Sequence, residues 1–316
     1  MRKKDSKTCS PKLFRKKIRK EDIPLYIMAL PTVVILILFN YLPMGGLILA
    51  FKKYNVGKGI WGSDFAGLKN FEYLFATTDA FIITRNTVLY NIVFIVMNMS
   101  LAVIMALTLN ELHSKRSAKV FQTIYMMPHF LSWAAVAILV GAFLERSNGY
   151  VNYIREVMGY GGPVDWYKRI GIWPFLLVLI NAWKGVGYQT VLYLAAISGI
   201  PGDYYEAAVL DGASRFQQAR YITLPHLRFI VSISLIMSMG HIFRGDFGLF
   251  YTVTRDSGVL YPVTNVIDTY VYRGLINQQN VGMSAAAGLF QSVVGLLFIL
   301  MANKIVAKVD PDSAMF

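Results

Sequence analysis

The sequence predicts an all-α protein that crosses a membrane about six times. Of its 316 residues, 55% are hydrophobic and only 16% are charged, whereas a soluble domain carries about 25% charged residues. Crossing about 30 Å of hydrocarbon takes roughly 20 helical residues, and six apolar stretches are about that long. We place the spans at residues 25–50, 86–110, 120–144, 171–200, 227–251 and 280–305.

The basic N-terminal tail, residues 1–23, orients the chain. Ten of the 31 basic residues precede the first span, so the positive-inside rule predicts a cytoplasmic tail. With six spans, the short tail at residues 310–316 is then cytoplasmic too. A cleaved signal peptide is the alternative, but the first apolar run is far longer than the 7–15 residues of such a peptide. The charge distribution indicates contact with membrane lipid and argues against nucleic acid.

The motifs of common enzymes are missing from the sequence. It contains no G-x4-G-K-[ST] phosphate loop, no H-E-x-x-H and no G-x-S-x-G, and its four histidines are scattered. Cys9 is the single cysteine, which excludes an internal disulfide and a cysteine-based metal site. We therefore expect no enzyme, no metal site and no cofactor bound by this chain. Uphill transport would draw its energy from a partner or from an ion gradient.

Two short capped helices are expected in the loop at residues 201–226, between the fourth and fifth spans. Asp203 with Glu206 three residues later predicts the start of one helix, and Gly212 predicts its left-handed end. Ser214 with Gln217 predicts the start of the second helix.

The second helix should stop near residue 223, because Leu224-Pro225 follows. Phe216 and Ile222 are apolar groups that this topology places in water. Such groups on a rigid element favour a partner protein. A helix pair lying among lipid headgroups is the alternative.

The same loop carries a family resemblance. Its order is Glu-Ala-Ala, three residues, Gly, nine residues, Ile, one residue, Leu-Pro. This resembles the EAA loop of permease subunits of ATP-binding-cassette (ABC) importers. The residues concerned are Glu206, Ala207, Ala208, Asp211, Gly212, Ala213, Phe216, Ile222, Leu224 and Pro225.

The resemblance covers roughly residues 24–309, which form one permease domain. The fourth span and its loop, "NAWKGVGYQTVLYLAAISGIPGDYYEAAVLDGA", are similar to carbohydrate importers of the maltose-permease type. The stretches "GDFGLFYTVT" and "VIDTYVYRGL" are similar to the LplB-like branch, whose members take up oligosaccharides and polysaccharide fragments.

The resemblance implies a type I ABC importer permease core in a bacterial cytoplasmic (inner) membrane. The EAA loop would form a cytoplasmic coupling helix that docks on an ATP-binding subunit. Expected partners are a second homologous permease in a heterodimer, two ATP-binding subunits and an extracytoplasmic solute-binding protein. ATP and Mg would be bound by the ATP-binding subunits.

Polar and aromatic residues inside two spans suggest a substrate pathway, because ionisable groups in a span face a cavity or a partner. The candidates are Asn181, Trp183, Lys184, Tyr188, Gln189, His241, Arg244 and Asp246. Aromatic faces suit sugar rings, and the amide and charged groups suit sugar hydroxyls. Three of these groups are basic and would also suit an acidic sugar. Each residue has an alternative role: Lys184 in particular could bind a carboxylate or carbonyl between helices.

Two other classes compete with this interpretation. An ion-coupled secondary transporter predicts inverted repeats, which we do not find in the sequence. A membrane enzyme would need paired carboxylates or a metal cluster at one depth, and neither is evident.

Overall fold

The computed structural model describes residues 23–76, 78–112 and 114–309 and divides into two units at residue 48. The first unit contains α1 (Ile23–Leu36), the π-helical turn η2 (Ile37–Tyr41) and α2 (Leu42–Met44), and η3 (Gly45–Phe51) passes the boundary. Together these elements form one apolar run, Ile23–Phe51, long enough to span a membrane. This run overlaps the first predicted span.

Four long helices form the frame of the second unit: α5 (Thr78–Asn110), α9 (Trp173–Ser198), α12 (Leu224–Gly240) and α15 (Val281–Val309). Helix α5 packs along α9, and α12 packs against α15. Ala102, Ala106 and Ala182 are buried between α5 and α9, since small side chains let helices approach closely in lipid.

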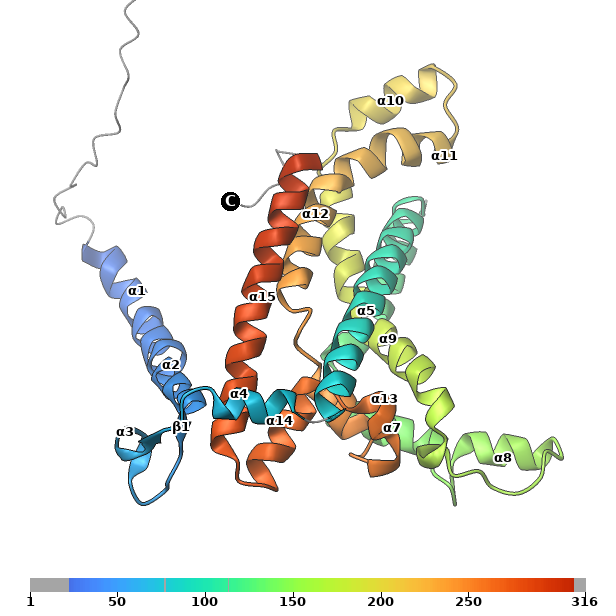
Figure 1. Ribbon diagram of the computed structural model, residues 1–316. Coiled ribbons are helices and arrows are strands. Elements are labelled where there is room, and N and C mark those ends of the chain that lie inside the picture. The colour runs from blue at the N-terminus through green and yellow to red at the C-terminus, as the bar shows by residue number, and fades with distance from the viewer. Residues whose placement is uncertain (1–22, 77, 113, 310–316) are drawn as a thin grey trace, which may run out of the picture. The chain divides into compact units, whose positions relative to one another are not determined.

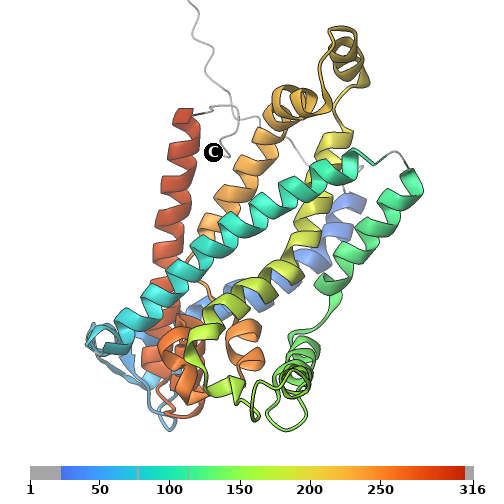
Figure 2. The same cartoon turned by 90° about the vertical axis from the view of Figure 1, so that its right-hand side faces the viewer.

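Shorter elements lie at the two ends of this frame (Figures 1 and 2). One end carries α10 (Gly202–Leu210) and α11 (Arg215–Gln218). The other end carries α4 (Lys69–Phe75), α7 (Trp133–Leu144), α8 (Tyr150–Val157), α13 (Tyr261–Thr264) and α14 (Ile267–Ile276). It also holds α3 (Gly59–Gly62) and a two-stranded antiparallel hairpin, β1 (Lys52–Lys53) and β2 (Asp64–Phe65), in which Lys52 is opposite Phe65. The remaining short turns are η5 (Trp166–Lys168), η6 (Ile170–Ile172) and η9 (Gly258–Leu260).

The stretch VIDTYVYRGL lies almost entirely in α14. In the described part of the chain, five helices are long and apolar enough to cross a membrane, or six if one bent pair counts as a span. The all-α, multi-pass class is therefore confirmed.

The third predicted span, residues 120–144, is not one helix. Helix α6 (Lys115–Met126), extended by η4 (Met127–Phe130), meets α7 at an angle of 97°. Pro128 is the second residue of η4, and Leu131 after it is extended. The Ser132 side chain accepts a hydrogen bond from the Ala135 N–H and starts a new helix. The predicted single span is broken here because Pro128 lacks an N–H and the Ser132 cap starts a second helix.

The fifth predicted span, residues 227–251, is also interrupted. Helix α12 ends at Gly240, and helical structure resumes only in the π-helical segment η8 (Gly248–Val253). Close contacts at two glycines hold the break. A Cβ on Gly245 would lie 2.6 Å from Val266, and a Cβ on Gly248 would lie 2.1 Å from Trp133.

We predict that Gly248→Ala lowers stability by about 1–3 kcal/mol, because the added methyl collides with the rigid Cβ and ring base of Trp133. Gly288→Ala is the matched control, since open space surrounds that position. Thermal unfolding of both variants in detergent measures the difference. Equal unfolding temperatures for wild type and Gly248→Ala would contradict this packing.

Candidate functional site

The EAA loop begins with α10, which ends in a Schellman motif. The Ala213 N–H donates to the Ala208 carbonyl at 2.9 Å, and the Gly212 N–H donates to the Val209 carbonyl at 3.0 Å. Gly212 has φ of +77°, the left-handed conformation that favours glycine. The predicted left-handed stop is confirmed. The predicted cap at Asp203 is wrong, because the helix already begins at Gly202 and Pro201 is its N-cap.

The second helix of the loop starts as predicted. Ser214 and Gln217 form a capping box, with the Gln217 side chain accepting from the Ser214 N–H at 2.7 Å. The helix does not stop at residue 223, however. It runs through the π-helical turn η7 (Ala219–Thr223) directly into α12, forming one helix over Arg215–Gly240. Pro225 lies inside this continuous helix, directly after the π-helical turn, and does not end it.

Two polar contacts fasten the loop to the long helices. The Tyr205 hydroxyl lies 3.0 Å from the Thr223 hydroxyl, which links α10 to η7. Arg215 donates to Glu111, just beyond α5, at 2.8 Å. Sequence reasoning missed both contacts, because their partners are 18 and 104 residues apart along the chain.

The loop presents its side chains outward. Leu210 is 89% exposed and Phe216 is 73% exposed. The other predicted coupling residues are also on the surface: Glu206, Ala207, Asp211, Gly212, Leu224 and Pro225 are exposed, and Ala208, Ala213 and Ile222 are half-buried. Apolar groups this accessible on a capped, fastened element are typical of a protein-docking surface.

The second candidate site surrounds the two broken spans. Lys184 on α9 donates to the His129 carbonyl at 2.8 Å and to the Leu131 carbonyl at 2.6 Å. Both carbonyls belong to the α6–α7 break, which leaves them without helical partners. The Lys184 ammonium also lies 5.2 Å from the centre of the Trp133 ring. Lys184 thus makes the carbonyl contacts that the sequence allowed as its alternative role.

Side-chain amides serve the break after α12 in the same way. Asn91 donates to the Ile242 carbonyl at 3.0 Å and to the Arg244 carbonyl at 2.9 Å. Gln291 donates to the Phe243 carbonyl at 2.9 Å. Neither amide was a sequence candidate, although an amide within an apolar run was a signal that could have found them.

Asp268 on α14 also binds the backbone of this break. Its carboxylate accepts from the Gly245 N–H at 2.5 Å and from the Gln291 amide at 3.0 Å. Burial raises the pKa of the Asp268 carboxyl above its usual range, and these hydrogen bonds and the charge of Arg244 oppose the rise.

The remaining sequence candidates lie around these breaks. Asn181 accepts from Asn98 at 2.8 Å, and Tyr188 stacks on His129 with ring centres 4.9 Å apart. Trp183 lines an apolar cavity of about 400 Å³ between α5, α6 and α9. The side-chain oxygen of Gln189 is buried and makes no hydrogen bond within the described residues. The His241 ring lies 3.0 Å from the Met237 carbonyl of its own helix. Arg244 is exposed, and Asp246 accepts from the Leu249 N–H at 3.4 Å.

The structure brings the two predicted sets together through Trp133. Its ring lies beside Lys184, and its base lies against Gly248. Within the described part of the chain, no three His, Cys, Asp or Glu side chains are grouped so that they could hold a metal ion.

A family model described as binding-protein-dependent transport system inner membrane component matches residues 98–311. The chain belongs to this family. Protein LplB of Bacillus subtilis (strain 168) is 33% identical to this permease, over 93% of this chain and 91% of its own. The polygalacturonan/rhamnogalacturonan transport system permease protein YteP of the same organism is 32% identical, over 90% and 88% of the two chains.

Solved structures agree with these sequence relatives. A bacterial ABC transporter involved in import of the acidic polysaccharide alginate has a chain with a TM-score of 0.82 and 32% identity, covering 92% of this permease and 97% of that chain. A bacterial alginate ABC transporter in complex with an alginate pentasaccharide-bound periplasmic protein gives a TM-score of 0.81, also at 32% identity. The type I ABC importer permease fold and the resemblance to carbohydrate permeases are thereby confirmed.

We predict that Lys184→Met lowers the free energy of unfolding by about 1–3 kcal/mol, because it removes the donor to two carbonyls at the α6–α7 break. Lys304→Met, at an exposed position on α15, is the matched control. Thermal unfolding and transport are measured on the same preparations. A Lys184→Met protein with wild-type stability but no transport would instead assign Lys184 to the substrate.

Proposed function

We propose that this chain is one permease subunit of an ABC importer that carries an oligosaccharide or polysaccharide fragment into the cell. It would pair with a second, homologous permease and two ATP-binding subunits, and receive its substrate from an extracytoplasmic solute-binding protein. The observation that carries this proposal is the exposed, capped and fastened EAA loop at one end of the long helices.

The loop would act as the coupling element between ATP hydrolysis and the spans. Leu210 and Phe216 offer an apolar surface to the ATP-binding subunit. Movement of that surface would pass to α12 through the continuous helix Arg215–Gly240 and the Tyr205–Thr223 contact. The Arg215–Glu111 ion pair offers a second connection, to the end of α5. With the loop in the cytoplasm, six spans would put both termini there as well, and ATP and Mg would be bound by the partner subunits.

The substrate class follows from the relatives and from the charge of the pathway. YteP is described as a polygalacturonan/rhamnogalacturonan permease, and both structural neighbours come from alginate transporters. Those polysaccharides are rich in carboxylated sugars. His241 and Arg244, both exposed, supply complementary cationic or proton-donating groups in this chain. We therefore propose an acidic oligosaccharide as the substrate class.

An ion-coupled secondary transporter remains the second candidate. It shares the feature of broken helices within the membrane, which the α6–α7 and α12–η8 interruptions provide. It leaves the exposed EAA loop without a role, so the two candidates differ in whether an ATP-binding subunit must associate.

We predict that Gly212→Val and Glu206→Lys abolish co-purification with the cognate ATP-binding subunit or uncouple its ATP hydrolysis. Valine is strained at φ of +77°, and lysine reverses the charge of an exposed loop residue. Gly171→Val is the control, because open space surrounds that glycine near the N-terminal end of α9. If folded wild-type protein recruits no ATP-binding subunit, the importer proposal fails and the ion-coupled candidate replaces it.

We predict that Tyr205→Phe retains the ATP-binding subunit but reduces transport-coupled ATP hydrolysis about 2–10-fold, the equivalent of one lost hydrogen bond. Thr223→Val should cause the same loss, and the double variant should be no worse than either single one. Additive losses in this double-mutant cycle would show that the two hydroxyls do not act as a pair.

A further inference from the structure

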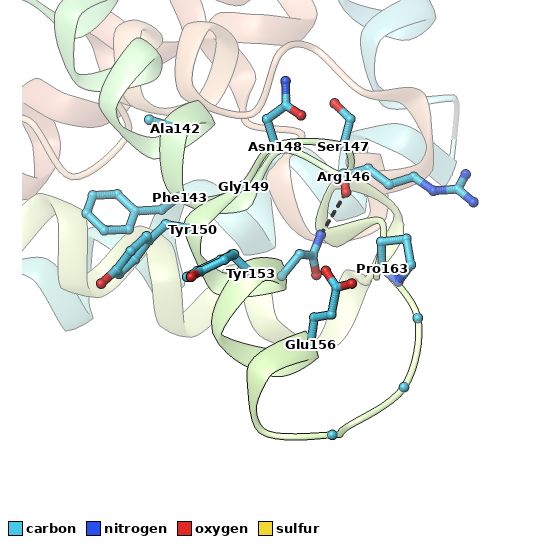
Figure 3. A pocket seen from close by; sticks show the side chains of 14 residues that line it. Ala142, Phe143, Arg146, Ser147, Asn148, Gly149, Tyr150, Tyr153, Glu156 and Pro163 are labelled. Carbon is cyan, nitrogen blue, oxygen red and sulfur yellow. Dashed lines mark hydrogen bonds between the residues drawn. The ribbon is translucent and has the colours of Figure 1, made fainter.

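A large groove lies between the end of α7 and helix α8, outside both sites described above. Its volume is about 1190 Å³, above the usual range for small-molecule pockets. The rings of Phe143, Tyr150 and Tyr153 follow one another along one side (Figure 3). Their exposed fractions are 51%, 55% and 62%, and neighbouring ring centres are 6.1 and 6.4 Å apart.

A basic pocket of about 600 Å³ adjoins this groove and shares Arg146, Gly162 and Pro163 with it. Its cationic side chains are Arg146, Arg155, Lys168 and Arg169, against the single acidic residue Asp165. Asp165 pairs with Lys168 at 3.1 Å. Arg155 donates to the Tyr160 carbonyl at 3.0 Å and its guanidinium lies 5.9 Å from the centre of the Trp166 ring, so this cation is held in place in the pocket lining.

The wall between the two cavities is held by one buried amide. Asn152 is 6% exposed and donates to the carbonyls of Glu145, Arg146 and Val164 at 2.9–3.2 Å. Its oxygen accepts from the Val164 N–H and from the Trp166 indole, both at 3.1 Å. The cavities are therefore preformed, and binding a ligand would cost little ordering of the backbone.

The edge of the groove beside the basic pocket consists of glycines, so no side chains stand between the two cavities there. Gly159 and Gly161 have φ of +75° and +82°, and open space surrounds both positions and Gly162. A long ligand can therefore cross from the groove to the basic pocket over bare backbone.

The two cavities lie at the far end of α9 from the EAA loop. Helix α9 has 26 residues, or roughly 39 Å at 1.5 Å each, enough to cross the hydrocarbon. If the EAA loop is cytoplasmic, as the proposed function requires, these cavities face the outside.

We propose that the aromatic groove and the basic pocket form one external binding site for an acidic oligosaccharide. The exposed rings would stack on sugar faces, with Asn148 and Glu156 in the same groove to bond hydroxyls. The guanidinium groups of Arg146 and Arg155 would pair with carboxylates. A phospholipid headgroup would use only the basic pocket and would leave its acyl chains against these polar groups. The inference rests on the proposed function for the substrate class and for the outward direction.

The test uses the full-length permease in nanodiscs of neutral phosphatidylcholine, without a solute-binding protein. Isothermal titration compares an oligogalacturonate with a neutral maltooligosaccharide. We expect the oligogalacturonate alone to bind, and Tyr153→Ala and Arg146→Gln to weaken its binding at least about tenfold. The controls are Trp61→Ala and Lys53→Ala, an exposed aromatic and an exposed cation at the same end of the unit.

Three results would overturn the site: no binding to wild type, equal binding of the neutral sugar, or unchanged affinity in both groove variants. Loss of saccharide binding in phosphatidylglycerol nanodiscs, with Tyr153→Ala behaving as wild type, would make the basic pocket a headgroup site instead. Association with the ATP-binding subunit is measured on the same preparations. If it is intact while no saccharide binds, only the external site fails; if it is absent, the proposed function fails as well.

Discussion

The structure depends on one constraint: a backbone carbonyl or N–H freed inside an apolar span must find a partner within the protein. Two spans are interrupted, and their freed groups bond to side chains from other helices. Lys184 serves the α6–α7 break, while Asn91 and Gln291 serve the break after α12. Each donor comes from a long neighbouring helix, so the breaks are held in place by α5, α9 and α15. Lys184, which the sequence suggests as a substrate-pathway residue, therefore stabilises the broken backbone around that pathway.

The two breaks are in contact with each other, since α7 packs against η8. Trp133 lies at their meeting point, against Gly248 and beside Lys184. The continuous helix Arg215–Gly240 joins the EAA loop directly to the second break, which begins after Gly240. A displacement of the loop would thus reach the centre of the unit without crossing a flexible joint. That connection gives a physical route by which hydrolysis in a partner subunit could open or close a path between α9 and α12.

Much of this could be predicted from the sequence, because the signals were local. Long uncharged runs predicted about six spans, against five or six in the described residues. Gly212 and the Ser214–Gln217 pair predicted the end and start of the loop helices. The two breaks could not be predicted in the same way. Pro128 is compatible with a kinked span or with a broken one, and Pro225 is compatible with a helix end or with a continuous helix that contains a π-helical turn. Asn91, Gln291 and Asp268 gained their roles from residues more than 20 positions away.

The central claim is that this permease moves an acidic oligosaccharide inward at the expense of ATP. Uptake into proteoliposomes that contain the complete importer, with its solute-binding protein outside, tests it most directly. We predict accumulation of an oligogalacturonate when ATP and Mg are supplied on the side of the ATP-binding subunits and every ion gradient is collapsed. Accumulation driven by a proton or sodium gradient in the absence of ATP would contradict the account.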